Sequence, residues 1–203
     1  MTASQSTTDR SSYLRPSEPL PGQGLTWVRA IDHPELLAPR TFTALKTWHD
    51  GVPQVADLIH VAAINPAVSD TAAMSDEYRI DMHLSVNCVL VAGKREGKER
   101  NAAVAVRASR RADINGAIRR MLAVRKASFV PVDRAVQDSE MEYGGITPLG
   151  LGAEWPVLLD LDIAHDPSWI VLGSGVRRSK LALPGTTLAA LSGTHCVAGI
   201  ALA

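Results

Sequence analysis

Residues 86–106 read VNCVLVAGKREGKERNAAVAV, and this stretch decides the fold. Two apolar runs, residues 86–92 and 102–106, flank a charged segment that contains a glycine. Runs of this length and composition around a polar turn predict two β-strands joined as a hairpin. The first run is almost continuously apolar, which is typical of a strand covered on both faces.

Further short strands are expected around this hairpin. One precedes it at residues 58–64, and others follow at residues 157–163, 169–172, 181–183 and 196–202. Helical segments are expected at residues 33–48, after Ser69 or Asp70, after Asp113, at 136–141 and at 187–191. Many short strands with few helices favour a mixed, partly closed sheet over a doubly wound parallel one. The predicted fold class is therefore α/β, of the α+β type.

The chain is expected to contain one domain and an N-terminal extension. Residues 1–24 are rich in Ser, Thr, Pro and Gly, which predicts a disordered tail. Residues 25–57 form a helical extension that serves as a lid or accessory element. Residues 58–203 carry the strands and are expected to form the functional domain.

Composition narrows the function classes. Basic and acidic residues balance at 21 each, so no global field indicates a nucleic-acid or membrane partner. No apolar run reaches the length of a membrane helix, and the N-terminus lacks the apolar region of a secretory signal. Cys88 and Cys196 lie in apolar stretches and are expected to be reduced. We therefore expect a cytoplasmic protein without a membrane partner.

Charge is unevenly distributed along the chain. Residues 94–134 contain 12 Lys or Arg and 4 Asp or Glu. One interpretation is a solvated helix face and hairpin tip, and the other is a surface that faces phosphate groups.

The usual catalytic motifs are absent. The six histidines are scattered, and there is no CxxC, no G-x-S-x-G and no P-loop, so neither a metal nor a cofactor is expected. The remaining candidate is the loop YGGITPLG at residues 143–150. Its two glycines allow a ligand to approach backbone N–H groups, and Pro148 stiffens the exit. Alone, a loop of this kind is more often an ordinary tight turn.

The segments around this loop resemble a known family, the YbaK/EbsC-like proteins and the related editing domain inserted in bacterial prolyl-tRNA synthetases. The resemblance covers roughly residues 58–202 and rests on ordered segments: NCVLVAG, AAVAV, the amphipathic helix, RKASF, GGITPLG, PVLLD, IVLGSG and SKLAL. The loop matches the family's G-x-x-x-P signature, which helps to line an aminoacyl pocket. The resemblance implies a barrel-like mixed sheet flanked by helices. It also implies hydrolysis of a mischarged aminoacyl-tRNA by a free-standing domain acting in trans.

The resemblance also implies a set of site residues. Those expected to act in catalysis are Asn87, Gly144, Gly145 and Asp160, and those expected to bind substrate are Ile146, Thr147, Pro148, Ser128, Gly173, Ser174 and Gly175. Backbone N–H groups of the loop would hold the carbonyl oxygen, and Asp160 would orient water or the substrate amine. The alternative interpretations are a strand-end cap for Asp160 and a flexible turn for residues 173–175.

One position departs from the family pattern. Where the family usually has lysine in K-T-L-x-V, this chain has Asn87 in NCVLV. Asparagine donates and accepts hydrogen bonds but carries no positive charge, and it could simply satisfy neighbouring backbone groups. Arg125, Lys126 and Arg177 are the candidates to supply the missing charge and to contact tRNA.

Three functions remain open on this basis. The first is a deacylase for a tRNA that carries a small amino acid, with the aminoacylated acceptor end as partner. The second is a non-catalytic module that binds aminoacyl-tRNA or a small ligand, since the family lysine is missing. The third is a hydrolase of another small ester or amide. The pattern predicts nothing about oligomeric state.

Overall fold

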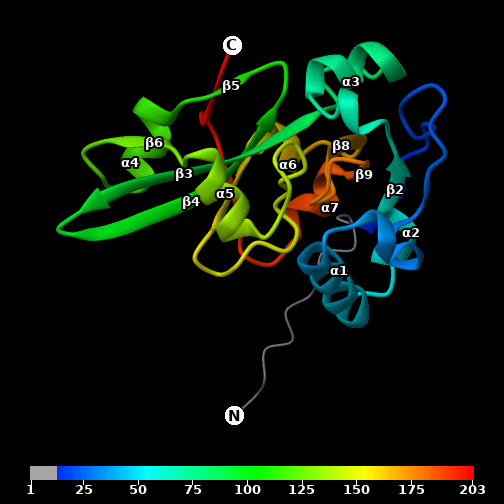
Figure 1. Ribbon diagram of the computed structural model, residues 1–203, viewed down its shortest axis with the longest axis horizontal. Helices are drawn as coiled ribbons and strands as arrows, with labels where there is room; N and C mark the ends of the chain where they lie inside the picture. The colour runs from blue at the N-terminus through cyan, green and yellow to red at the C-terminus, as the bar shows by residue number, and fades with distance from the viewer. Residues whose placement is uncertain (1–12) are drawn as a thin grey trace.

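The computed structural model describes residues 13–203, which form two main sheets (Figure 1). The first sheet is antiparallel, in the order β1 (Val28–Arg29), β2 (His60–Ala63), β9 (Ser179–Pro184) and β8 (Trp169–Gly173). The second has the order β10 (Thr194–Val197), β7 (Val157–Asp160), β4 (Lys98–Arg107), β3 (Val86–Arg95) and β6 (Ala127–Phe129). A small additional pair joins β5 (Arg111–Ala112) to β11 (Ala201–Leu202).

The central hairpin of the second sheet is the one expected from residues 86–106. β3 and β4 pair without interruption from Val86–Arg107 to Arg95–Lys98. Glu96 and Gly97 form the turn, both with positive φ, as two-residue hairpin turns require. Because the turn is so tight, pairing extends into the charged residues and both strands are longer than the apolar runs alone predict.

The second sheet is mixed, and neither main sheet closes into a barrel in the described part of the chain. β7 lies parallel to both β4 and β10, whereas β3 is antiparallel to β4 and β6. The two sheets meet where Ser85, just before β3, forms a parallel bridge with Val171 of β8. This confirms the mixed, partly closed α/β arrangement that the sequence predicts.

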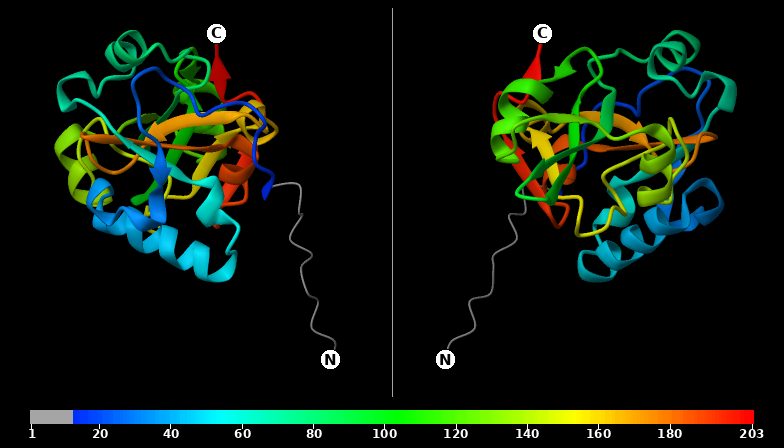
Figure 2. Two further views of the ribbon diagram at one scale, coloured as in Figure 1. Left: turned by 90° about the vertical axis from the view of Figure 1, so that its right-hand side faces the viewer. Right: turned by 60° about the vertical axis from the view of Figure 1, so that its left-hand side comes forward.

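Helices cover the edges of the sheets, and Figure 2 shows α1 and α3 on different sides of the strands. The helices are α1 (Pro39–Gly51), α2 (Val55–Leu58), α3 (Thr71–Tyr78), α4 (Arg119–Met121), α5 (Val132–Ser139), α6 (Leu161–Ala164) and α7 (Gly185–Ala189). A π-helical turn (Ile114–Ile118) precedes α4, and Asp113 caps it. No helix of residues 13–203 is long and apolar enough to cross a membrane.

One expected strand is shorter than predicted. The apolar run at residues 157–163 ends as a strand at Asp160, and α6 begins at Leu161. The Asp160 side chain accepts a hydrogen bond from the backbone N–H of Asp162 and so caps the helix. The apolar pattern alone does not separate a buried strand from a short buried helix.

The N-terminal segment packs against the domain wherever it is described. The first 12 residues of the expected tail lie outside the described residues, whereas residues 13–24 contact the body of the protein. Trp169 Nε1 donates to Glu18 O at 2.9 Å, and Gln23 N donates to Tyr78 O at 2.7 Å. Leu45 of α1 is fully buried in the same core as Leu172 of β8. The extension therefore completes the first sheet's core.

Candidate active-site cavity

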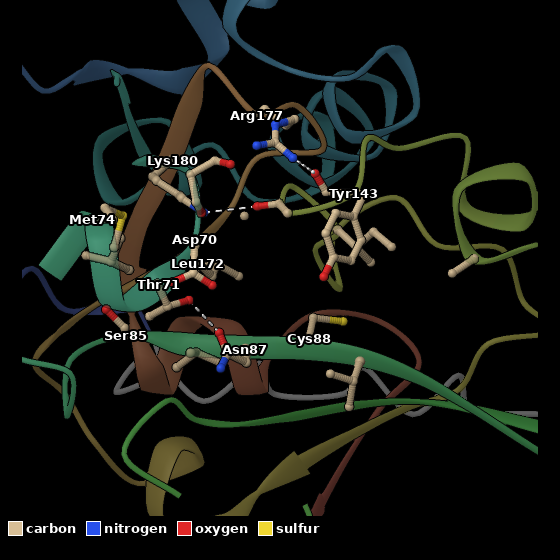
Figure 3. Close-up of a pocket in the computed structure, with 18 of the residues that line it drawn as sticks. Asp70, Thr71, Met74, Ser85, Asn87, Cys88, Tyr143, Leu172, Arg177 and Lys180 are labelled. Atoms are coloured by element: carbon tan, nitrogen blue, oxygen red, sulfur yellow. Dashed lines mark hydrogen bonds between the residues drawn. The ribbon is translucent and has the colours of Figure 1, made fainter. Parts of the chain in front are cut away.

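A cavity of about 530 Å³ lies where the two sheets meet (Figure 3). Its walls come from the first half of β3, the N-terminus of α3, the glycine–proline loop and the facing ends of β8 and β9. Most of the lining side chains are apolar, and they include Met74, Leu90, Val130 and Leu172. A mainly apolar cavity with a few convergent polar groups is typical of a small-molecule site.

The N-terminus of α3 is fixed over β3. Asp70 caps the helix by accepting hydrogen bonds from the backbone N–H groups of Ala72 and Ala73. This places Thr71 above the strand, where its hydroxyl donates to Asn87 Oδ1 at 2.8 Å. The Asn87 amide nitrogen has no hydrogen-bond partner within residues 13–203, and Asn87 lines both this cavity and the neighbouring one.

The cavity also contains a buried lysine from β9. Lys180 is only 5% exposed, and its Nζ donates to Ser69 O at 3.0 Å and to Gly144 O at 3.1 Å. The pKa of Lys180 is lowered to about 8, mainly by burial; the Asp70 carboxylate opposes this shift, and the Arg177 guanidinium adds to it. Lys180 therefore brings a positive charge to a cavity where Asn87 brings none.

The glycine–proline loop crosses the loop between β8 and β9 at very short range. Gly175 N donates to Gly145 O at 2.7 Å, and Glu142 N donates to Gly175 O at 2.9 Å. A Cβ on Gly173 would collide with the carbonyl oxygen of Gly145, and a Cβ on Gly145 would lie 2.7 Å from the Val176 backbone. Because glycine has no Cβ, these residues allow the backbones of the two loops to approach to hydrogen-bonding distance.

This crossing limits which backbone N–H groups a ligand can use. Gly145 N donates to Glu142 O, and Thr147 N donates to the sulfur of Met141. Among residues 144–147, the N–H groups without an acceptor in the described residues 13–203 are those of Gly144 and Ile146, and both residues line the cavity.

The structure brings together part of the predicted site. Asn87, Gly144, Ile146, Gly173 and Arg177 all line the cavity. The Arg177 guanidinium donates to the carbonyl oxygens of Tyr143 and Pro66, both at 3.3 Å. It therefore ties two loops together at the edge of the cavity.

Several predicted loop residues lie behind the wall and do not line the cavity. Gly145, Thr147 and Pro148 support the loop from behind, and Thr147 is fully buried. The Ser174 hydroxyl bonds to Ser179 and to the backbone of Val176, and Gly175 packs on Ala38. These residues hold the crossing in place.

The remaining predicted residues are farther away. Asp160 is 3% exposed and caps α6, and burial raises its pKa. Ser128 lines a neighbouring, more open cavity. Arg125 and Lys126 are exposed just before β6, beside Gly93 of β3. Since Gly93 is six residues along the strand from Asn87, they lie about 20 Å from it.

Sequence reasoning missed Lys180, Thr71 and Asp70. The segment SKLALP did carry a signal, because a lysine stands among apolar residues in an expected strand. Lysine is rarely buried without a partner, so a lysine in this pattern indicates a candidate functional residue. No group of His, Cys, Asp or Glu that could hold a metal ion occurs among the described residues.

Fold and cavity together define a mixed α/β domain with a candidate small-ligand site beside a glycine–proline loop. The sequence matches the aminoacyl-tRNA editing domain family over residues 65–191, and the chain belongs to this family. This confirms the resemblance to the YbaK-like editing proteins.

Solved structures agree with the fold. A proposed trans-editing enzyme for prolyl-tRNA synthetase is 16% identical with a TM-score of 0.63, covering 80% of this chain and 97% of that one. A hypothetical protein is 14% identical with a TM-score of 0.66, covering 78% and 99%. A protein from work on epitope grafting onto scaffolds is 18% identical with a TM-score of 0.64, covering 79% and 95%. No curated protein matches the sequence.

Proposed function

We propose that this protein is an aminoacyl-tRNA deacylase that acts in trans on a tRNA carrying a small amino acid. Family membership supports the reaction class. The observation that carries the proposal is the cavity itself, which has apolar walls and a few hydrogen-bonding groups at the meeting point of the two sheets.

The cavity suits an aminoacyl ester better than a free amino acid. Its volume of about 530 Å³ leaves room for the terminal ribose beside a small side chain. The apolar walls would contact the side chain, and the Asn87 amide and the N–H groups of Gly144 and Ile146 would contact polar atoms of the ester. These groups would position the carbonyl for attack.

In the proposed reaction, water attacks the ester carbonyl carbon. The bond from this carbon to the ribose oxygen then breaks, which releases the amino acid and a tRNA with a free hydroxyl. Asp70 is the one carboxylate that lines the described cavity, and its side chain caps α3. We therefore assign the assistance of the attacking water to the ribose hydroxyl next to the ester.

The test is a deacylation panel with the full chain. Each tRNA is charged with its own or a wrong small amino acid, and release of the amino acid is compared with spontaneous hydrolysis. Cys88→Phe is the blocking variant, because Cys88 lines the cavity on β3 and a larger side chain there would fill it. Lys46→Met is the control, since Lys46 is exposed on α1.

We expect at least one pair to be hydrolysed by the wild type and the control and not by Cys88→Phe. Absence of turnover for every pair would reject the proposal. Tight binding of the charged tRNA without turnover would instead indicate a binding module. Equal activity on a small ester without tRNA would indicate a hydrolase of another class.

A further inference from the structure

Lys180 has a geometry that a purely structural lysine does not need. It projects from β9 into the cavity and donates to two backbone carbonyls, Ser69 O and Gly144 O, which belong to two adjoining segments of the wall, one before α3 and one in the glycine–proline loop. A lysine ammonium has three N–H donors. The third has no acceptor within residues 13–203, and Figure 3 shows the amine between the glycine loop and Asp70.

The two carbonyls fix the amine in place. Lys180 is almost fully buried, so its position does not depend on a flexible, solvated side chain. A fixed donor in a largely apolar cavity stabilises a developing negative charge more strongly than a solvated one. Arg177 has its guanidinium committed to Tyr143 and Pro66, which leaves Lys180 as the cation best placed to meet a ligand.

We propose that Lys180 is the catalytic cation of this site: its third N–H binds the ester carbonyl oxygen of the substrate and stabilises the negative charge that forms there when water attacks. This inference rests on the proposed function. Lys180 on β9 would then supply the positive charge that the family pattern expects from a lysine at position 87 on β3.

The proposal predicts a specific protonation requirement. Only the ammonium form has three N–H donors and a positive charge, so activity falls as pH rises through about 8. The charged groups that act on Lys180 are Asp70, before α3, and Arg177, between β8 and β9. Burial raises the pKa of Cys88, on β3, to about 12, so this thiol stays neutral over the same range. Tyr143 lines the same cavity from the glycine loop.

The decisive variant is Lys180→Gln. The glutamine amide nitrogen has two N–H donors, enough for Ser69 O and Gly144 O, but it has no third donor and no charge. Lys180→Met removes all three donors, and Lys180→Arg keeps the charge. Lys46→Met serves as the matched control on an exposed lysine. Circular dichroism verifies that each variant is folded.

Two measurements separate this inference from the proposed function. The first is kcat and KM on the tRNA that the panel identifies. The second is binding of a 3′-aminoacylamino-adenosine, a stable amide analogue, followed by calorimetry and by the NMR signal of the lysine Nζ. The second measurement needs no turnover.

We expect Lys180→Gln to lower kcat about 100-fold and to raise KM about tenfold, and Lys180→Arg to retain more activity than Lys180→Gln. The analogue should shift the Nζ signal and bind at least tenfold more weakly to Lys180→Gln. Unchanged kcat in Lys180→Gln would overturn the inference while leaving the deacylase in place. If no tRNA is hydrolysed, the proposed function fails, and the analogue decides: an unshifted Nζ signal or equal binding would overturn the role of Lys180.

Discussion

At the scale of single residues, the burial of Lys180 links stability to pH. Its pKa is about 8 in the folded protein, compared with 10.5 for an ordinary lysine. Between these values the unfolded chain binds the additional proton, so the free energy of unfolding rises with pH. The effect over this window is at most about 3 kcal/mol.

Urea denaturation at pH 7.5, 9 and 10.5 measures this linkage. We expect the wild type and Lys46→Met to gain stability across the window relative to Lys180→Met, which has no group to deprotonate at position 180. Parallel pH profiles for all of these proteins would show that Lys180 titrates like an exposed lysine.

The same residue shows what the sequence could predict. Asn87 and Gly144 were predictable because each lies in a short segment that can be recognised from local pattern. Lys180 acquires its environment from partners 111 and 36 positions away in the chain, Ser69 and Gly144. Local pattern identifies a lysine in an apolar strand but does not show which groups contact its amine. Asp160 shows another limit of local pattern. An aspartate at the end of a strand can cap a helix or line a pocket, and the sequence alone does not distinguish the two.

At the scale of elements, the crossing of the two glycine loops shapes the cavity. Gly173→Ala places a methyl group against the backbone oxygens of Gly145 and Ile146, and backbone cannot move aside as a flexible side chain can. We expect a loss of about 1–3 kcal/mol of stability and a large loss of deacylation, because the loop that lines the cavity must shift. Thermal denaturation and the deacylation assay measure both effects.

Gly51→Ala is the matched control for this prediction. Gly51 is the last residue of α1, and nothing lies within 4 Å of a Cβ added there. This substitution should leave stability within about 0.5 kcal/mol of the wild type or raise it slightly. Equal stability and activity for Gly173→Ala and Gly51→Ala would show that the crossing tolerates a side chain.

The hairpin and the loop crossing differ in how far they could be predicted. β3 and β4 follow from two neighbouring apolar runs and a turn, all within about 20 residues of sequence. The crossing joins segments about 30 residues apart and depends on backbone contacts that no apolar pattern encodes. The sequence therefore indicates that the glycines of both loops allow unusual backbone conformations, but it does not show that the two loops contact each other.

At the scale of the whole molecule, the buried ion pair between Arg107 and Asp166 connects β4 to the segment before β8. Arg107 is 3% exposed, and its guanidinium donates to Asp166 Oδ2 and to His83 O, both at 2.6 Å. Burial opposes ionisation of Asp166, but the hydrogen bonds from Arg107 and Ser168 prevail and lower its pKa. The pair thus contributes stability at neutral pH that is lost as the carboxylate becomes protonated in acid.

Asp166→Asn tests this connection. Removing the charged partner leaves the buried Arg107 uncompensated, which typically costs about 3–5 kcal/mol. We expect a clear drop in melting temperature at pH 7 that narrows as the pH falls toward 3. Asp162→Asn is the control, because its ion pair with Arg110 is exposed. Equal losses in the two variants would contradict the assignment.

The proposed substrate, a tRNA, is much larger than the cavity, and the basic stretch at residues 94–134 lies where the rest of the tRNA would pass. Ion pairs with Glu99 and Asp138 compensate Arg134, and Arg107 and Arg110 are paired with Asp166 and Asp162. Arg125 and Lys126 have no ion pair within residues 13–203 and are exposed beside β3. A tRNA whose 3′ end enters the cavity at Asn87 would pass along this strand toward them.

We therefore expect Arg125→Ala combined with Lys126→Ala to weaken tRNA recognition and to spare the chemistry. The KM for charged tRNA should rise about tenfold, and the salt dependence of binding should become shallower by about one to two phosphate contacts. The kcat, and hydrolysis of a small aminoacyl-adenosine ester, should stay unchanged, since both residues lie about 20 Å from Asn87. Lys46→Ala on α1, away from β6 in Figure 1, is the control. An equal loss on the small ester would mean that these residues support the cavity and do not contact tRNA.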